Sequence, residues 1–219
     1  MNRITYRMVH SIFLFLLVLI ILAVFPNESA MAEDAGRAEF EKLLQDLYDN
    51  GTIPTTNGNV ISYGDYVDEM AEMGYFRLTP LGESQRFVFS VHFNWESATR
   101  TPNLMNSGCG LFFQGEQGTN NHLLYSLRMD GIFYFSGYKG NKTLSFIRTP
   151  YSMPTVEGEA DLVAVVNGAQ VKLYLDGKEV FSKDDLPVMG DLYGVAVLSG
   201  TNKDYGIRCT GKNMFVYTW

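Results

Sequence analysis

The sequence predicts an all-β protein, an antiparallel two-sheet sandwich with a small N-terminal helical cap. The first observation is a series of short β-branched and aromatic runs, separated by Gly, Asn, Asp or Pro, over residues 161–219. Such runs are typical of consecutive antiparallel strands. The second is an aromatic content of 14% in a chain that is 46% hydrophobic. Flat side chains of this kind fill the space between two packed sheets.

A third observation is the alternation of side chains over residues 87–95, which is typical of a strand with one buried face. The apolar face of this segment consists of Phe87, Phe89, Val91 and Phe93. A meander of strands is expected over residues 109–148, and Asp176-Gly177 predicts a hairpin turn within the closing stretch. We therefore assign residues 86–219 to the sandwich.

Residues 33–85 are expected to form the helical cap and its connecting loops. Leu43 and Leu47 share one face of an amphipathic helix, and we expect both to pack on the sandwich. Further along, residues 62–65 have the form of a capping box. Residues 66–74 are accordingly either a short helix or an irregular segment packed on the sandwich edge.

Residues 1–32 have the pattern of a signal peptide. Arg3 and Arg7 precede an uninterrupted apolar run, and Ala30-Met31-Ala32 is an A-x-A cleavage site. The run is about 14 residues long, whereas a membrane span needs roughly 20. We expect cleavage after Ala32 and a protein that is secreted or held in the cell envelope. A retained N-terminal segment, as the protein's one membrane anchor, is the alternative.

Charge and cysteine content narrow the partners. The chain has a net charge of −7, which argues against nucleic acid and anionic membrane surfaces, because both attract a positive footprint. Its two cysteines are Cys109 and Cys209. In an exported chain such a pair favours a disulfide over a metal site or a reactive thiol. We expect a Cys109–Cys209 disulfide, and two separate buried thiols are the alternative.

A series of motifs in the sandwich region carries a family resemblance. The motifs are Asn106-Ser-Gly-Cys-Gly-Leu-Phe-Phe, Asp130-Gly131, Leu162-Val-Ala-Val-Val-Asn, Val171-Lys-Leu-Tyr-Leu-Asp-Gly-Lys-Glu-Val and Gly206-Ile-Arg-Cys. Their order resembles the concanavalin A-like, laminin-G-like jelly-roll sandwiches, in particular bacterial exported domains of unknown function. The resemblance spans roughly residues 87–219 and implies a two-sheet jelly roll, often one that binds a glycan or a protein. It carries over no active site, since lectins, glycosidases and adhesion modules share this fold.

No catalytic or metal-binding residue is assigned from the sequence. A glycosidase needs two carboxylates about 5 to 10 Å apart, and the alternating Glu-x-Asp-x-x-Glu arrangement of glycosidases in the resembled superfamily does not occur. The acid nearest to His92 is Glu96, which lies about 13 Å away along a strand, too far to share a metal. No cofactor is expected. Calcium stays open because loop carboxylates are its usual ligands, and the loop acids are Asp130, Asp176, Asp184 and Asp185.

The candidate ligand-binding residues combine tyrosines of the meander with polar side chains of residues 87–95 that are expected to lie nearby. They are Tyr125, Tyr134, Tyr138, His92 and Asn94. Tyr134 and Tyr138 are four residues apart and share one strand face, and Tyr125 on a neighbouring strand is expected to join them on this platform face. The hydroxyl groups of the tyrosines need water or a partner. The function expected is non-catalytic recognition of a glycan or cell-envelope ligand. A glycoside-processing enzyme and a purely structural envelope domain are the alternatives.

Overall fold

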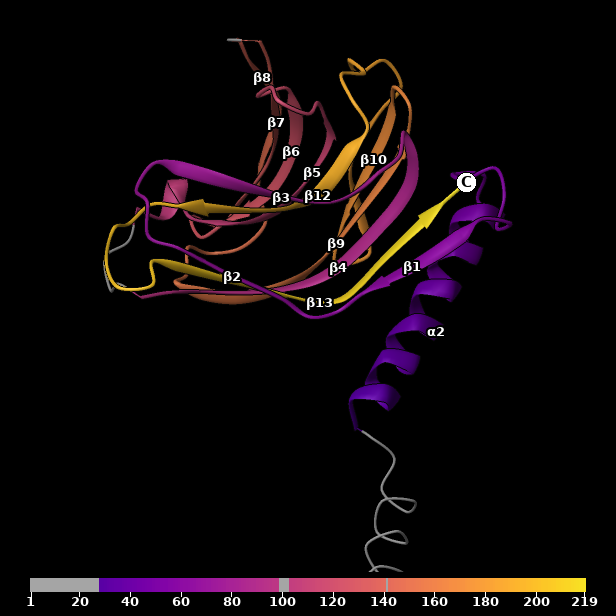
Figure 1. Cartoon of the computed structure of the whole chain (residues 1–219), viewed down its shortest axis with the longest axis horizontal. Coiled ribbons are helices and arrows are strands. Elements are labelled where there is room, and N and C mark those ends of the chain that lie inside the picture. The colour runs from indigo at the N-terminus through magenta and orange to yellow at the C-terminus, as the bar shows by residue number, and fades with distance from the viewer. Residues whose placement is uncertain (1–27, 99–102, 141) are drawn as a thin grey trace, which may run out of the picture. The chain divides into compact units, whose positions relative to one another are not determined.

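The structure is a computed structural model that describes residues 28–98, 103–140 and 142–219, and Figure 1 shows its course. Residues 1–27, with the apolar run of the predicted signal peptide, lie outside the described residues. The elements in chain order are α2 (Glu28–Asp49), β1 (Asn59–Tyr63), β2 (Tyr66–Met70), β3 (Tyr75–Glu83), β4 (Arg86–Ser97), η1 (Leu104–Asn106), β5 (Gly108–Gly115), β6 (His122–Arg128), β7 (Ile132–Lys139), β8 (Lys142–Pro150), β9 (Glu157–Asn167), β10 (Gln170–Leu175), β11 (Lys178–Lys183), β12 (Leu192–Ser199) and β13 (Ile207–Thr218).

In the described part of the chain the strands form two antiparallel sheets. Sheet A has seven strands in the order β1-β13-β4-β9-β10-β11, with β2 also paired to β13. Sheet B has six strands in the order β3-β12-β5-β6-β7-β8. Figure 1 shows the sheets as two layers, and the chain passes between them repeatedly. The predicted fold class, an antiparallel two-sheet jelly-roll sandwich, is confirmed.

The hydrophobic core lies between the two sheets. The apolar face predicted for residues 87–95 is confirmed, because the four side chains of that face are buried in one cluster with apolar residues of sheet B. Aromatic rings meet within it, and the ring centroids of Phe113 and Phe135 lie 5.8 Å apart. The strands of sheet B thus have one face fixed by the core, so their alternate side chains point to its outer face.

The predicted disulfide between Cys109 and Cys209 is confirmed. Cys109 lies on β5 of sheet B and Cys209 on β13 of sheet A, with Cα atoms 5.9 Å apart. Both residues are fully buried. The bridge therefore ties the two layers together through the core.

The chain divides into two compact units, residues 1–41 and 42–219, and α2 runs across their boundary. Ala32, the predicted cleavage site, lies within α2. Leu47, which lies in the second unit, was predicted to be on the packed face of the helix. Its exposed fraction of 2% agrees with that prediction. Leu44 is also buried, whereas Leu43 is half-buried. The packed face of the helix therefore includes Leu44 more fully than Leu43.

The segment predicted as cap and loops contains three strands. Residues 66–70 form β2, so the predicted short helix is wrong here. β2 pairs with residues 207–211 of β13, the same strand whose second half pairs with β1. The long edge of β13 offers backbone partners that an isolated capping signal cannot match, because tertiary pairing overrides a local motif. β3, in turn, is the edge strand of sheet B beside β12.

Candidate functional site

The outer face of sheet B is concave. Because Cys109 points into the core, Gly108 and Gly110 lie on the outer face of β5. A Cβ atom there would fall 2.0 Å from the Leu127 carbonyl oxygen and 2.3 Å from the Tyr125 carbonyl oxygen, respectively. No side chain fits in this space. The sheet therefore bends toward its outer side at β5 and β6, where the glycines permit close approach.

Ring contacts across the sheet confirm this curvature. Phe76 lies on β3 and Tyr138 on β7, four strands away in the sheet order. In a flat sheet four strand spacings amount to about 19 Å. The centroids of the two rings are nevertheless 5.7 Å apart and nearly parallel. Strands β5 to β8 visibly curve in Figure 1, and the curl brings the opposite sides of the outer face together.

An apolar floor and a pocket lie on this concave face. The floor is a buried cluster separate from the main core, made of Phe112, Leu124, Ala196 and Leu198. A pocket of about 140 Å³ opens beside it, and Tyr75, Phe76 and Tyr138 are among the nine residues that line it. Tyr75 is 68% exposed, so an aromatic ring stands free at the rim.

One face of β6 supplies a row of polar atoms to the concave face. Antiparallel register places His122, Ser126 and Arg128 on this face, opposite Tyr138 and Tyr134 of β7 and Gly108 and Gly110 of β5. The Nε2 atom of His122, the Oγ atom of Ser126 and the Nε atom of Arg128 are buried, and none hydrogen-bonds to the described part of the chain. Buried polar atoms normally have partners, so three such atoms in one row need an explanation.

The protonation of His122 follows from its one hydrogen bond. Its Nδ1 atom lies 2.9 Å from the carbonyl oxygen of Asn120. Because a carbonyl oxygen can only accept, Nδ1 carries the proton and Nε2 is left as an acceptor. Burial lowers the pKa of His122 below its ordinary value, with the Asn120 contact acting in the opposite direction. The imidazole is therefore neutral at pH 7 and presents a lone pair to the concave face.

Arg128 is held in place by an aromatic ring and a carbonyl group. Its Cζ atom lies 3.8 Å from the centroid of the Tyr134 ring, and Arg148 approaches the same ring at 5.4 Å. The Nη1 atom of Arg128 donates to the carbonyl oxygen of Met105 at 2.7 Å. Burial lowers the pKa of Arg128, yet a guanidinium remains charged at neutral pH. The stack orients the guanidinium and leaves its Nε–H unpaired.

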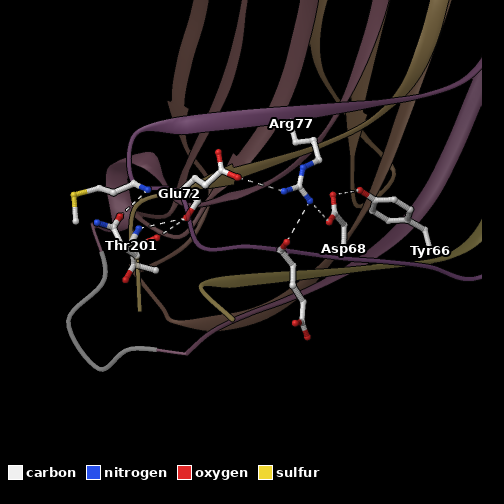
Figure 2. A network of polar contacts seen from close by, with 9 residues as sticks. Tyr66, Asp68, Glu72, Arg77 and Thr201 are labelled. Atoms are coloured by element: carbon white, nitrogen blue, oxygen red, sulfur yellow. Dashed lines mark hydrogen bonds and ion pairs between the residues drawn. The ribbon is translucent and has the colours of Figure 1, made fainter. Parts of the chain in front are cut away.

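A polar network holds the turn between β2 and β3, which carries the pocket's rim (Figure 2). Arg77 donates to Asp68 at 2.6 Å and pairs with Glu72 at 3.7 Å. Tyr66 donates to the other oxygen of Asp68 at 3.0 Å, and burial raises the pKa of Tyr66. Because Arg77 directly follows Phe76 in β3, the network fixes the strand segment that places Phe76 over the floor.

The tyrosines predicted from the sequence divide between two faces. Tyr134 and Tyr138 lie on the concave face, and their assignment to a ligand site stays a prediction. Tyr125 does not join them, because its register partner on β7 is Phe135, which points into the core. Its ring is fully buried and its hydroxyl donates to the Tyr174 carbonyl oxygen at 2.6 Å. The expectation that Tyr125 shares the platform face is therefore wrong.

His92 and Asn94 lie apart from these tyrosines, on the outer side of sheet A. The Nδ1 atom of His92 is 2.8 Å from Asp161, and its Nε2 atom is 3.8 Å from Glu159. Both acids come from β9, the neighbouring strand. The expectation that the nearest acid is the distant Glu96 was wrong, because it considered one strand only and ignored cross-strand partners.

Asn94 lines a second pocket, of about 340 Å³, at the end of β4 and β9. Glu96 and Glu69 both pair with Arg208 there, so the guanidinium is already neutralised. The buried indole Nε1–H of Trp95 has no partner in the described part of the chain. Four of the eight residues that line the pocket are charged, and each of these is exposed or already paired. The Trp95 indole is its one unpaired donor among the described residues. The concave face has three such atoms and is therefore the stronger candidate.

The described residues contain no cluster of side chains that supports the calcium hypothesis. No group of three or more His, Cys, Asp or Glu side chains within the described ranges could hold a metal ion. Asp130 and Asp176, two of the predicted loop acids, have local roles. Asp130 accepts a hydrogen bond from the Ile132 amide, and Asp176 accepts one from the Asp161 amide.

Sequence reasoning did not identify Phe76, Ser126 or His122 as site residues. Phe76 belongs to a segment expected to be a loop. Nothing in the sequence therefore predicted that its ring would contact Tyr138 across the sheet. Ser126 and His122 did have a signal, because every second residue of segment 122–128 lies on the face opposite the core, and these residues are polar except for Leu124. The polar positions of that alternation mark the site.

Comparisons with known proteins find likeness in fold only. No protein-family model and no curated protein matches the chain. Among solved structures, the carbohydrate-binding module CBM66 from Bacillus subtilis shares 13% identity at a TM-score of 0.48, covering 68% of this chain and 99% of that one. Galectin LEC-6 from Caenorhabditis elegans shares 13% identity at a TM-score of 0.40, covering 67% and 95%.

A fructosyltransferase from A. japonicus shares 11% identity at a TM-score of 0.45. The match covers 74% of this chain but 26% of that enzyme, so the chain spans about a quarter of its length. Identities and TM-scores this low assign no ligand and no activity to the chain.

Proposed function

We propose that this protein binds a glycan, without catalysis, on the concave outer face of sheet B. The observation that carries the proposal is the row of unpaired, buried hydrogen-bonding atoms along β6, flanked by the rings of Phe76, Tyr134 and Tyr138. Leaving such atoms unpaired costs about 1–3 kcal/mol each in stability. A ligand that supplies partners for them recovers this cost.

Sugars match this combination of groups. A sugar ring presents apolar C–H faces that pack on aromatic rings, and a rim of hydroxyl groups that donate and accept hydrogen bonds. The row offers an acceptor at His122, a donor and acceptor at Ser126, and a donor at Arg128. Ligand sites commonly combine an apolar lining with a few convergent polar groups. Ser126 and His122 are buried and neither lines the pocket, so the side chains that cover them must move for a sugar to reach them.

The lining favours binding over hydrolysis. Glycoside hydrolysis needs a pair of carboxylates at the scissile bond. None of the nine residues that line the concave-face pocket, all within the described part of the chain, is an Asp or a Glu. Three acids do alternate along β9, namely Glu157, Glu159 and Asp161, but they lie on the exposed outer side of sheet A. The alternative of a glycoside-processing enzyme would have to use these.

An extracellular or envelope location fits this proposal. The buried disulfide is of the kind that forms and persists in oxidising compartments. Within the described residues, no helix is both long enough and apolar enough to cross a membrane. Export by the N-terminal segment stays a prediction, and N-terminal sequencing of the mature protein would detect processing at Ala32.

The test is a glycan array probed with the intact protein, followed by affinity measurements on two serine variants. Ser126→Ala removes the unpaired hydroxyl group from the row, and we expect it to weaken binding of any glycan found by about tenfold. Ser182→Ala is the matched control, because Ser182 is exposed on β11 of sheet A. It should leave the affinity unchanged.

Two results would count against the proposal. Equal affinities for the two variants would place the glycan elsewhere on the molecule. No binding to any glycan by the folded protein would favour the structural envelope domain.

A further inference from the structure

We propose that the glycan is acidic and that its carboxylate binds at the edge of the Arg128–Tyr134–Arg148 stack. This inference rests on the proposed function and names the ligand class, a glycan that contains uronic acid units. The stack is defined by the two guanidinium groups that approach the Tyr134 ring at 3.8 Å and 5.4 Å.

Charge is distributed in a way that favours an anion at this place. The strands β6, β7 and β8 contain four basic residues and no acidic residue: Arg128, Lys139, Lys142 and Arg148. The whole chain, in contrast, has a net charge of −7. Arg128 and Arg148 meet at the Tyr134 ring, whereas Lys139 and Lys142 pair at the other end of the β7–β8 hairpin. Positive charge of this kind within an acidic protein raises the local concentration of anionic ligands.

The two guanidinium groups are free to accept an anion. Neither Arg128 nor Arg148 forms an ion pair with a carboxylate of the described residues, unlike Arg77 and Arg208. The acid closest to the stack in sequence is Asp130, whose negative charge acts on Arg128 without forming an ion pair with it. Its carboxylate oxygens are hydrogen-bonded to other groups. One of its oxygens accepts from the Ile132 amide and the other from the Tyr134 hydroxyl.

Arg128 in particular is prepared to hold a carboxylate. Its Nη1 atom is occupied by the Met105 carbonyl oxygen, and its flat face rests on Tyr134. The remaining edge of the guanidinium, which includes the buried Nε–H, has no partner among the described residues. Arg donates to carboxylates through such an edge, often with two parallel hydrogen bonds.

The neighbouring groups suit the rest of a uronic acid. Tyr138 lies four residues from Tyr134 on the same strand, and Ser136 lies between them on the same face. One sugar ring can pack on Tyr138, in place of the Phe76 ring that now stacks on it, while its carboxylate reaches the Arg128–Tyr134–Arg148 stack. The aromatic face of Tyr134 is covered by Arg128, so this tyrosine positions the guanidinium and is not the sugar platform.

The experiment compares acidic polysaccharides with their carboxyl-reduced forms, which keep the sugar rings and lose the charge. Polygalacturonate, alginate and hyaluronan are each tested in both forms against the intact protein by calorimetry. At least one acidic form should bind about tenfold or more tightly than its reduced form. Arg148→Gln should remove this preference. Lys212→Gln removes the same charge from an exposed site on sheet A and should retain the preference.

The outcomes separate this inference from the proposed function. Equal binding of acidic and reduced forms would overturn the acidic ligand and leave glycan binding intact. A preference that survives in Arg148→Gln, with a melting temperature equal to that of the unmodified protein, would also overturn it. Absence of binding to both forms and to all neutral glycans would overturn the proposed function and, with it, this inference.

Discussion

Ser126 is the residue at which stability and function should oppose each other. Its hydroxyl group is fully buried and makes no hydrogen bond to the described part of the chain. Replacing such a group by a methyl removes a desolvation cost. We expect Ser126→Ala to leave the free energy of unfolding unchanged or to raise it by about 1 kcal/mol, while glycan binding weakens. A clear loss of stability in urea titrations would show that the hydroxyl has a structural partner.

His122 should make stability depend on pH. Burial lowers its pKa in the folded protein, so below about pH 6.5 the unfolded chain binds a proton that the folded protein resists. The stabilisation from neutral His122 is complete above pH 6.5 and declines as the pH falls through the lowered pKa. His122→Phe should therefore lose less stability than the unmodified protein between pH 7 and pH 5. An identical decline in the variant and in the unmodified protein would contradict this account of His122.

Side-chain direction was predictable where a residue's own strand decided it, and not where a neighbouring strand did. Tyr134 and Tyr138 were correctly placed on one face because their spacing within β7 fixes it. Tyr125 was misplaced because its face depends on the register of β6 against β7, which pairs it with Phe135. His92 was misjudged for the same reason, since its acidic partners come from β9. Register is set by turns and by the core, which a single strand's pattern does not reveal.

At the scale of elements, the last turns of α2 should contribute to the stability of the larger unit. Leu47 is 2% exposed, and deletion of a buried leucine side chain costs about 2–5 kcal/mol. Leu47→Ala should lower the free energy of unfolding by that amount, as measured by chemical denaturation. Leu43→Ala should cost less, because Leu43 is half-buried. Equal effects of the two substitutions, or none, would refute the assignment of the packed face.

The strands after residue 86 were more predictable than those before it. Segments such as 87–95 have a strong alternation that agrees with their place in the sheet. β2 had a capping signal instead, and it is a strand because β13 extends far enough to pair with both β1 and β2. Its position at the edge, together with the Arg77 network, then sets where Phe76 stands. The capping signal at residues 62–65 is local, so it could not indicate that β13, far away in the sequence, would offer a free edge for β2 to pair with.

At the scale of the whole molecule, the disulfide should account for a large share of stability. It joins residues 100 apart in sequence and bridges the two sheets. In the chain-entropy model a closed loop of this length is worth roughly 4–5 kcal/mol, less where strain intervenes. The double variant Cys109→Ala, Cys209→Ala should therefore unfold at much lower denaturant concentration. Its control is reduction of the unmodified protein, which should give a similar loss. Alkylation of both thiols without a reductant would show that the bridge is absent.

The sandwich itself was predictable because many weak strand signals agree, but the concavity of sheet B was not. It arises from the close approach of β6 to the glycines of β5 and from the ring of Phe76 meeting Tyr138. Neither is visible until the strand order is known. The candidate site therefore depends on how the whole sheet is assembled. Of its residues, only Tyr134 and Tyr138 were predicted from the sequence.

The central claim is that the concave outer face of sheet B binds a glycan. The most direct measurement is the mapping of amide chemical-shift changes in the intact, nitrogen-15-labelled protein, titrated with a glycan that binds it on the array. We predict that the changes gather on β6 and β7, around Ser126 and Tyr138, and on the start of β3 at Phe76. Changes gathered instead on β4 and β9, around His92 and Trp95, would place the ligand on sheet A and contradict the claim.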